Sequence, residues 1–383
     1  MNRWQKNRNF VLQFFRKTGK LDNPTTRKLE TSTMSSRKLS NFLSPEELRA
    51  RLEAETEPRI TFSFYRYANI AEPELFRNEC YLRWSELDVF GRVYVATEGI
   101  NGQVSVPASK FDSFKAALYS VDFMKGMRLN IAIEAEAESF LKLKIKVRPK
   151  IVADGLNDDT FDVTKRGRHL TALEVNKLLD QKDTIVVDMR NHYESEVGYF
   201  EGAIRPDITN FRDLLPVVEE MLEDKKEQNI VMYCTGGIRC EKASAYYLHR
   251  GFENVAMVDG GIIEYARQCE ALGLESKYLG KNFVFDERLG ERISEHVVSH
   301  CHQCGNPSDR QLDCANEACH ILFVQCEACA EKFEDCCSTQ CKDFIQLPEE
   351  EQRKLKITTL FNGQKFGKAL RASMVRAGEA ELK

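Results

Sequence analysis

Apolar and polar residues repeat with two different periods along residues 44–150, which indicates a small mixed domain. Some segments alternate with period two, as in half-buried strands, and others carry apolar side chains at helical spacing. The segment 98–101 between two alternating stretches is a hairpin signal. The predicted elements are a strand over 60–65, a helix over 73–87, strands over 91–97 and 102–106, a helix over 109–118 and a strand over 140–147. This β-α-β-β-α-β order predicts a ferredoxin-like α+β domain.

The last predicted strand of this domain carries a basic residue at every second position. Side chains alternate between the two faces of a strand, so these bases should share one face and the intervening apolar residues the other. One interpretation is an ordinary solvated face, and the other is a surface for the phosphates of a nucleic acid. The candidate RNA-binding residues are Lys142, Lys144, Lys146, Arg148 and Lys150.

Strands and helices alternate over residues 166–280, after a linker predicted over 151–165. Such alternation predicts a parallel α/β sheet with helices on both faces, and the site should lie where the strands end. The predicted elements are helices over 171–179, 211–222 and 262–272 and strands over 185–188, 230–233 and 255–258.

The segment 230–244 carries the candidate chemistry of this domain. A strand-like run ends at Cys234, a small-residue loop follows, and a helical pattern begins near Cys240. Unpartnered backbone N–H groups and the helix dipole stabilise a thiolate at such a position, and Arg239 adds a positive charge. Residues 234–240, here called the cysteine loop, thus form a candidate anion cradle; its other members are Thr235, Gly236, Gly237, Ile238 and Cys240. The alternative is a buried structural cysteine.

Cys240 has two interpretations of its own. As a small residue in the first helical turn, it can simply fill space in the core. It can also resolve an oxidised Cys234 by forming a disulfide that thiols reduce again.

The cysteine loop resembles the active-site loop of the rhodanese family, whose pattern is matched here by Cys234, Gly237 and Arg239. A second signature of that family matches residues 187–204, which include Asp188, Arg190 and Glu194, and a third matches residues 258–261. The resemblance implies a rhodanese-like domain. It also implies that Asp188, Arg190 and Arg239 hold the cradle around a catalytic Cys234.

Residues 281–345 form a third, cysteine-rich segment. Paired thiolates a few residues apart hold tetrahedral zinc, so two four-thiolate sites fit, and free or disulfide-linked thiols are the alternative. One predicted site is Cys301, Cys304, Cys326 and Cys329; the other is Cys314, Cys319, Cys336 or Cys337, and Cys341.

Charge and composition bound the remaining segments. The net charge is −4, yet residues 1–40 carry +8 and residues 352–383 carry +6, which favours a disordered basic extension over 1–43 and a basic tail over 346–383. No apolar run is long enough to span a bilayer. Thirteen cysteines without a secretory signal favour a reducing compartment, hence the cytoplasm. Residues 1–33 are either an organelle transit segment or lie before a true start at Met34.

Residues 44–345 as a whole resemble the rhodanese-containing tRNA uridine hydroxylases. The resemblance rests on blocks at 90–94, 98–101, 146–148, 188–194, 233–244, 260–266, 280–288 and 300–304. It implies formation of 5-hydroxyuridine at the wobble position of tRNA with molecular oxygen as co-substrate. The wobble base would enter between the first two domains, where the Cys234 thiolate could add to its C6 atom.

The residues themselves leave other functions open. The sequence shows neither a two-histidine-one-carboxylate iron triad nor a nucleotide or flavin motif. The same cysteine loop suits a persulfide sulfurtransferase acting on a protein or small acceptor. A non-catalytic, zinc-stapled RNA adaptor is a third interpretation, and the sequence leaves the oligomeric state open.

Overall fold

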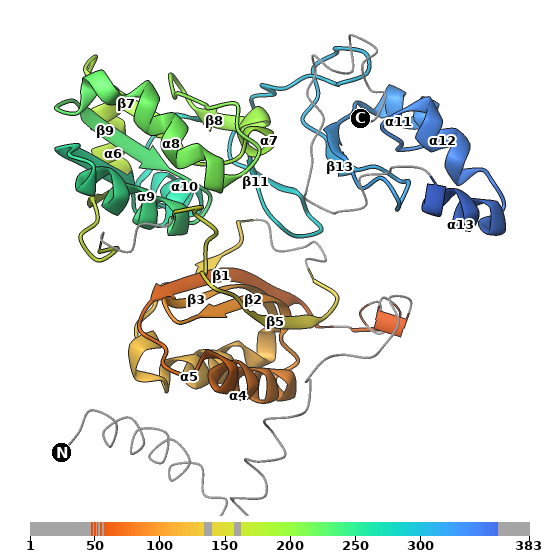
Figure 1. The fold of residues 1–383 in the computed structure, drawn as a ribbon, viewed down its shortest axis with the longest axis horizontal. Coiled ribbons are helices and arrows are strands. Elements are labelled where there is room, and N and C mark those ends of the chain that lie inside the picture. The colour runs from red at the N-terminus through yellow and green to blue at the C-terminus, as the bar shows by residue number, and fades with distance from the viewer. Residues whose placement is uncertain are drawn as a thin grey trace, which may run out of the picture.

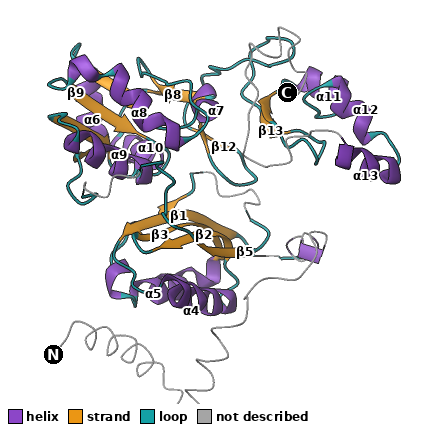
Figure 2. Cartoon of the chain, viewed as in Figure 1, coloured by secondary structure: helices purple, strands orange, loops and turns teal. Residues whose placement is uncertain are grey.

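The computed structural model describes residues 47–133 (except 49, 51, 53 and 56), 140–156 and 162–358 (Figures 1 and 2). The predicted basic extension over 1–43 lies outside the described residues, as does the tail beyond 358. The chain forms three parts: an N-terminal sheet backed by helices, a central α/β part, and a C-terminal part of short strands and helices (Figure 1). Within the described residues, every helix is too short or too polar to cross a membrane.

The N-terminal part confirms the predicted ferredoxin-like class but changes its last strand. The sheet order is β4-β1-β3-β2-β5, so the short β4 is the fourth strand of the ferredoxin-like pattern, beside β1. The basic strand β5 is an additional strand at the opposite edge, parallel to β2. The elements are β1 (Arg59–Tyr67), α4 (Pro73–Glu86), β2 (Phe90–Ala96), β3 (Gly99–Pro107), α5 (Phe111–Tyr119), β4 (Asn130–Ile131) and β5 (Leu143–Val147).

The two faces of this sheet have different partners. Phe62, Phe64 and other inward residues pack against Trp84 of α4 and Phe114 of α5, which forms the core of the domain. The opposite face, here called the open face, carries the alternate positions of β1, β2, β3 and β5, among them Tyr65. The open face is turned toward the central part of the molecule (Figure 1).

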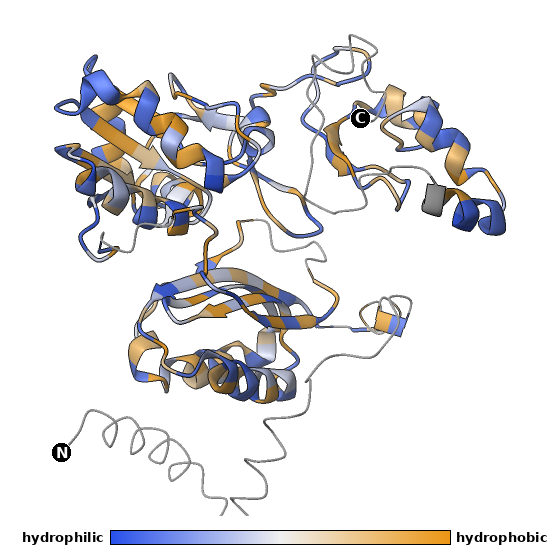
Figure 3. Cartoon of the chain, in the orientation of Figure 1, coloured by the Kyte–Doolittle hydropathy of each residue, from blue (hydrophilic) through white to orange (hydrophobic). Residues whose placement is uncertain are grey.

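The central part confirms the predicted parallel α/β fold, with sheet order β6-β10-β9-β7 and parallel pairing throughout. Its strands are strongly apolar (Figure 3) because helices cover both faces. Helices α8 and α9 pack on one face, and α6 and α10 on the other. The elements are β6 (Arg168–Leu170), α6 (Ala172–Leu179), β7 (Thr184–Asp188), α7 (His192–Glu196), β8 (Gly198–Phe200), α8 (Phe211–Met221), β9 (Asn229–Tyr233), α9 (Ile238–His249), β10 (Asn254–Val258) and α10 (Gly261–Leu272).

A second small sheet, β12-β11-β8, leads from the central part into the C-terminal part. The C-terminal elements are β11 (Tyr278–Phe283), β12 (Gly290–Arg292), β13 (Gln311–Asp313), β14 (Leu322–Val324), α11 (Glu327–Phe333), α12 (Thr339–Ile345) and α13 (Glu349–Thr358). The segment predicted as a basic tail over 346–383 contains the helix α13, which opens on three acidic residues at the favourable end of its dipole.

The segment predicted as a linker is in part packed between the first two domains. Ile151 and Asp154 are 3% and 1% exposed. Lys242 of α9 lies 2.8 Å from Asp154 and 2.9 Å from Glu98 of the N-terminal domain. Arg128 makes a bidentate contact with Asp259 at 2.7 and 2.6 Å. These ion pairs join the two domains beside the cysteine loop.

Candidate active site

The cysteine loop joins the end of β9 to the start of α9, as the sequence predicts. Gly237 caps α9 with φ +96°, a left-handed conformation that glycine adopts without strain. Its N–H donates to Cys234 Sγ at 3.2 Å. The start of α10 also approaches closely, since a Cβ on Gly261 would lie 2.4 Å from the Cys234 carbonyl oxygen. The glycines therefore allow the backbone to close around the sulfur.

The surroundings of Cys234 favour its thiolate. Burial alone raises its pKa, but the Cys240 thiol, the Arg239 charge and the backbone N–H groups of both residues outweigh burial, and the pKa falls to about 6. Burial and the neighbouring Cys234 raise the pKa of Cys240 well above its usual value, so Cys240 stays protonated as a donor. Cys234 is thus the ionised partner of a buried thiol pair.

Arg239 is held by Glu194 of α7. The guanidinium donates to both Glu194 carboxylate oxygens at 2.6 and 2.7 Å, and Glu194 is fully buried. Glu194 also accepts from the backbone N–H of Asn191 in a capping box, which fixes it in the first turn of α7. The charge near Cys234 is therefore set in place by a helix from the second rhodanese signature.

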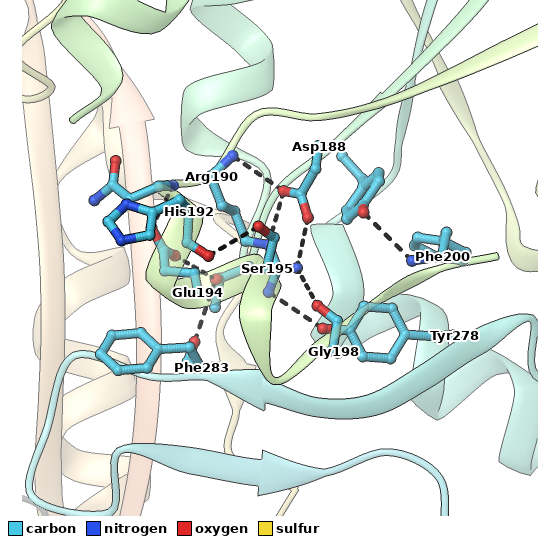
Figure 4. A network of polar contacts seen from close by, with 12 residues as sticks. Asp188, Arg190, His192, Glu194, Ser195, Gly198, Phe200, Tyr278 and Phe283 are labelled. Carbon is cyan, nitrogen blue, oxygen red and sulfur yellow. Dashed lines mark hydrogen bonds and ion pairs between the residues drawn. The ribbon is translucent and has the colours of Figure 1, made fainter. Parts of the chain in front are cut away.

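Asp188 and Arg190 belong to a network of polar contacts that also includes Gly198 and Tyr278 (Figure 4). Their side chains are completely buried and form an ion pair of 2.6 Å, and Arg190 also donates to Gly198 O and Tyr278 Oη. The Met189 N–H between them donates to Tyr233 O at the end of β9. This position fits the predicted role of holding the cradle, by positioning the strand that carries Cys234.

The open face of the N-terminal domain covers the cysteine loop. Tyr65 donates to Glu241 of α9 at 3.1 Å, and its hydroxyl would lie 2.9 Å from a Cβ on Gly237. Tyr67 donates to Ile238 O and Asn130 to Gly236 O, each at 3.4 Å. As a result, Cys234 has no solvent exposure, although its lowered pKa favours the thiolate, which is the reactive form of cysteine.

A pocket adjoins this loop between the domains and the segment after β11. The pocket is here called the base pocket, and its lining residues are Thr61, Phe62, Ser63, Gln103, Asn130, Ala132, Thr235, Ile263, Val284, Phe285, Asp286, Arg288 and Glu291. Three regions of the chain thus meet at a space that Thr235 of the cysteine loop lines.

The basic strand lies on the same open face as the base pocket, although it is shorter than predicted. Lys144 and Lys146 of β5 are exposed, and Lys144 pairs in register with Arg92 of β2. Burial and then the like charges of Lys146, Lys142 and Arg92 lower the pKa of Lys144. An anion bound here would relieve that repulsion.

One residue of the predicted basic face is engaged elsewhere, and another lies beside an aromatic ring. Lys150 lies beyond the strand and donates to Asp154 at 2.7 Å and to Leu156 O, so it serves the domain junction. The Arg148 guanidinium lies 5.9 Å from the centre of the Tyr94 ring and remains exposed. Strand alternation ends at Val147, which is why the five bases do not form one continuous row.

The cysteine-rich part contains two groups of four thiols, each with all sulfurs within 4.8 Å of one another. The groups are Cys301, Cys304, Cys326 and Cys329, and Cys314, Cys319, Cys337 and Cys341. The second group contains Cys337, while Cys336 belongs to neither group. Sulfur separations of 3.5 Å for Cys304–Cys326 and 3.8 Å for Cys319–Cys337 match the ~3.8 Å edge of a tetrahedron with ~2.3 Å Zn–S bonds. Both groups can bind a metal.

The cysteine-rich part packs directly on α7. His302 lies 2.6 Å from Glu196, and Gln311 donates to Tyr193 O at 2.8 Å. Tyr193 also shares a small apolar cluster with Phe283 and Leu322. Because α7 carries Glu194, the cysteine-rich part supports the residue that positions Arg239.

Several residues around Cys234 were not predicted from the sequence. Tyr65, Asn130, Arg288 and Glu291 reach the loop or the base pocket from other domains, and only the block at 280–288 had drawn attention to one of them. Strand alternation could have indicated that Tyr65 faces away from its own core. Nothing local indicates Asn130, which a two-residue strand brings beside Ser63.

The fold and the cysteine loop define a rhodanese-like protein with an N-terminal domain and a C-terminal extension. Family models agree: the UPF0176 acylphosphatase like domain matches residues 59–151, the rhodanese-like domain 171–268, and the rhodanase C-terminal region 279–342. Proteins named tRNA uridine(34) hydroxylase match over most of the chain. The one from Photorhabdus laumondii is 58% identical over 82% of this chain and 90% of its own length.

Two further relatives carry the same name. The protein from Pectobacterium carotovorum is 56% identical over 83% of this chain and 90% of its own, and that from Yersinia enterocolitica is 57% identical over 82% and 90%. This chain therefore belongs to the family of these proteins.

Proposed function

We propose that this protein hydroxylates the wobble uridine of tRNA. The observation that carries the proposal is an ionised, cradled thiol next to a pocket between the domains, in a chain that is 58% identical over 82% of its length to a protein named tRNA uridine(34) hydroxylase. An anticodon loop is single-stranded, so its bases can be splayed out into a protein pocket. The base pocket provides such a place between the first two domains.

The basic strand is proposed to hold the RNA backbone. Lys144, Lys146 and Arg148 are exposed on the open face, with Lys142 at the start of the strand and Arg92 beside Lys144. Arg92 also donates to Phe285 O, a residue of the base pocket, at 3.5 Å. Phosphates bound along this strand would therefore place a neighbouring base at the pocket entrance.

Cys234 is proposed as the nucleophile. Its thiolate adds to C6 of uracil, which leaves C5 electron-rich and able to attack molecular oxygen. The resulting C5 hydroperoxide becomes a hydroxyl when two electrons from a thiol reductant, which is oxidised to a disulfide, release the second oxygen atom as water. Loss of the C5 proton and departure of the thiolate restore the 5,6 double bond and free Cys234. In this scheme the positive charge of Arg239, held in place by Glu194, stabilises the Cys234 thiolate as it leaves.

Zinc is proposed for both four-cysteine groups, with a structural role. All four ligands of each group come from the protein, which leaves no open position for substrate. The metal would hold the cysteine-rich part in shape and thereby support α7. Thiolate ligands must stay reduced, which suits a reducing compartment such as the cytoplasm.

Nucleoside analysis of tRNA tests the proposal. A strain that lacks this gene and any redundant pathway should lose 5-hydroxyuridine derivatives, and the wild-type gene should restore them. A Cys234→Ser variant, which retains the size of the side chain but not the thiolate, should not. Unchanged levels of 5-hydroxyuridine derivatives in the deletion strain would refute the function.

A persulfide sulfurtransferase is the second candidate, favoured by the rhodanese-like geometry of the cysteine loop. Sulfur transfer from thiosulfate by purified protein, together with a failure to bind tRNA, would select it. Full complementation by Cys234→Ser would instead select a non-catalytic RNA adaptor.

A further inference from the structure

The base pocket lies directly above the cysteine loop, on the side of Gly236. A Cβ on Gly236 would be 3.6 Å from Asn130 Nδ2 and 3.6 Å from Ser63 Oγ. These two residues pair in register on β4 and β1 and both line the pocket. A planar base in the pocket would thus meet the cysteine loop on one side and polar groups of the N-terminal domain on another.

Asn130 is held in one orientation and has one unused acceptor. Its Nδ2 donates to Gly236 O at 3.4 Å, which assigns the amino group to the side of the loop. Its Oδ1 is buried without a hydrogen-bond partner, and the residue is 4% exposed. A buried acceptor left unpaired costs about 1–3 kcal/mol, so the site gains when a ligand supplies a donor.

Glu291 offers the only comparable group that we find among the described residues of the pocket lining. Its Oε1 accepts from the Ile133 N–H at 3.0 Å and from Arg288 at 2.5 Å, while Oε2 is buried without a partner. Burial raises the pKa of this carboxyl group. Glu291 is already engaged by two donors, and its substitution therefore serves as a comparison for Asn130.

We propose that Asn130 is a specificity-determining residue whose Oδ1 accepts the N3–H of uracil, so that the pocket admits uridine and rejects cytidine. This inference rests on the proposed function and names the recognition element of the same site. Uracil presents N3–H as a donor, whereas cytosine presents an unprotonated N3 that accepts. A freely rotating amide could suit either base, but the bond to Gly236 O prevents Asn130 from turning its amino group toward the base. A cytosine N3 would then face an oxygen, and neither acceptor would be satisfied.

Synthetic anticodon stem-loops test this assignment on the full-length protein. Three RNAs differ only at the wobble position, which carries uridine, cytidine or 3-methyluridine; the last lacks the N3–H but keeps both carbonyl oxygens. Wild-type protein should bind the uridine RNA at least ~10-fold more tightly than either other RNA, since a hydrogen bond in a buried site is lost with each. Asn130→Ala should weaken binding of the uridine RNA and bring the three affinities within about 2-fold of one another.

Two comparison variants separate recognition from folding. Asn254→Ala removes an amide that also donates to a carbonyl oxygen, Glu227 O, but far from the pocket, and should keep the wild-type preference. Glu291→Gln changes the other unpaired acceptor of the pocket and tests whether Glu291 rather than Asn130 sets the preference. The midpoint of the pH profile of Cys234 alkylation, which reports its pKa rather than its accessibility, should match the wild-type midpoint in each variant and so show that the cysteine loop is intact.

Each result has a definite meaning. A preference for uridine that survives in Asn130→Ala, or that disappears in Glu291→Gln instead, overturns the assignment to Asn130. Equal binding of all three RNAs by the wild type overturns it as well. A wild type that hydroxylates none of these RNAs and no tRNA would instead refute the proposed function itself.

Discussion

Removal of the Cys240 thiol tests how the cysteine loop ionises Cys234. Among the influences that lower the pKa of Cys234 against its burial, the hydrogen bond from Cys240 is the largest, ahead of the Arg239 charge. Cys240→Ala removes this donor and leaves Arg239 and the backbone N–H groups in place. The thiolate should therefore become less stable while the loop keeps its shape.

The size of the effect follows from the pKa of about 6, compared with an ordinary value of 9.0. Three pKa units correspond to about 4 kcal/mol of thiolate stabilisation. A hydrogen bond to a charged group contributes about 1.5–3 kcal/mol, so Cys240→Ala should raise the pKa by about 1–2 units. At pH 6.5 the thiolate fraction should then fall by roughly 3- to 25-fold.

Alkylation by iodoacetamide at pH 5 to 9 measures this change. The chain has thirteen cysteines, so the rate is taken from the peptide that contains Cys234 by mass spectrometry. Cys269→Ala, which removes another buried thiol on α10, is the matched control and should leave the profile unchanged. A wild-type midpoint near pH 9, or the same midpoint in Cys240→Ala, would refute the reasoning.

The same depressed pKa affects stability with a definite sign. A group with a lowered pKa in the folded state stabilises the fold fully above its unfolded pKa, and this contribution disappears as the pH falls through about 6. Cys240→Ala should thus reduce stability more at pH 9 than at pH 5. Urea unfolding at the two pH values measures the difference.

Three further predictions concern other parts of the site. Exchange of Lys144 and Lys146 for Glu should weaken tRNA binding and flatten its dependence on salt. Exchange of the exposed Lys182 for Glu should leave tRNA binding unchanged. An equal loss of affinity in the two variants would point to a general charge effect. Glu194→Ala leaves the buried Arg239 without its partner and should cost about 3–5 kcal/mol of stability in denaturant unfolding, and a cost below about 1 kcal/mol would contradict the buried-pair geometry. Purified protein should contain about two zinc ions by elemental analysis. Chelation of the zinc should slow alkylation of Cys234, because the cysteine-rich part supports α7. Protein without metal, or an unchanged alkylation rate, would contradict this prediction.

Local sequence patterns predicted the helices and strands of the central domain. Features that depend on contacts between distant segments were not predicted. The run from Ile230 to Cys234 reads as a strand because its apolar residues are buried on both sides, and the structure places β9 there. The sequence also predicted the basic strand, but not that it pairs with β2. Which strand lies at the edge of a sheet depends on the whole fold and is not encoded in any local pattern. Cysteine spacing likewise predicted one thiol group completely and left Cys336 and Cys337 unresolved. The choice between these neighbours depends on how the chain turns at 334–335, where both residues have positive φ.

The complete burial of Cys234 has a consequence for the survival of the protein under oxidising conditions. At pH 7 a thiol with a pKa of about 6 is roughly nine-tenths ionised, and such thiolates are the ones that dissolved peroxide oxidises first. Here the ionised sulfur is stored behind Tyr65, Tyr67 and Asn130, out of reach of solvent. Hydrogen bonds from these three side chains to α9 and to the cysteine loop hold the cover in place. Peroxide in solution should therefore oxidise Cys234 more slowly than the pKa of its thiol alone implies, because the buried sulfur is reached only when this cover opens.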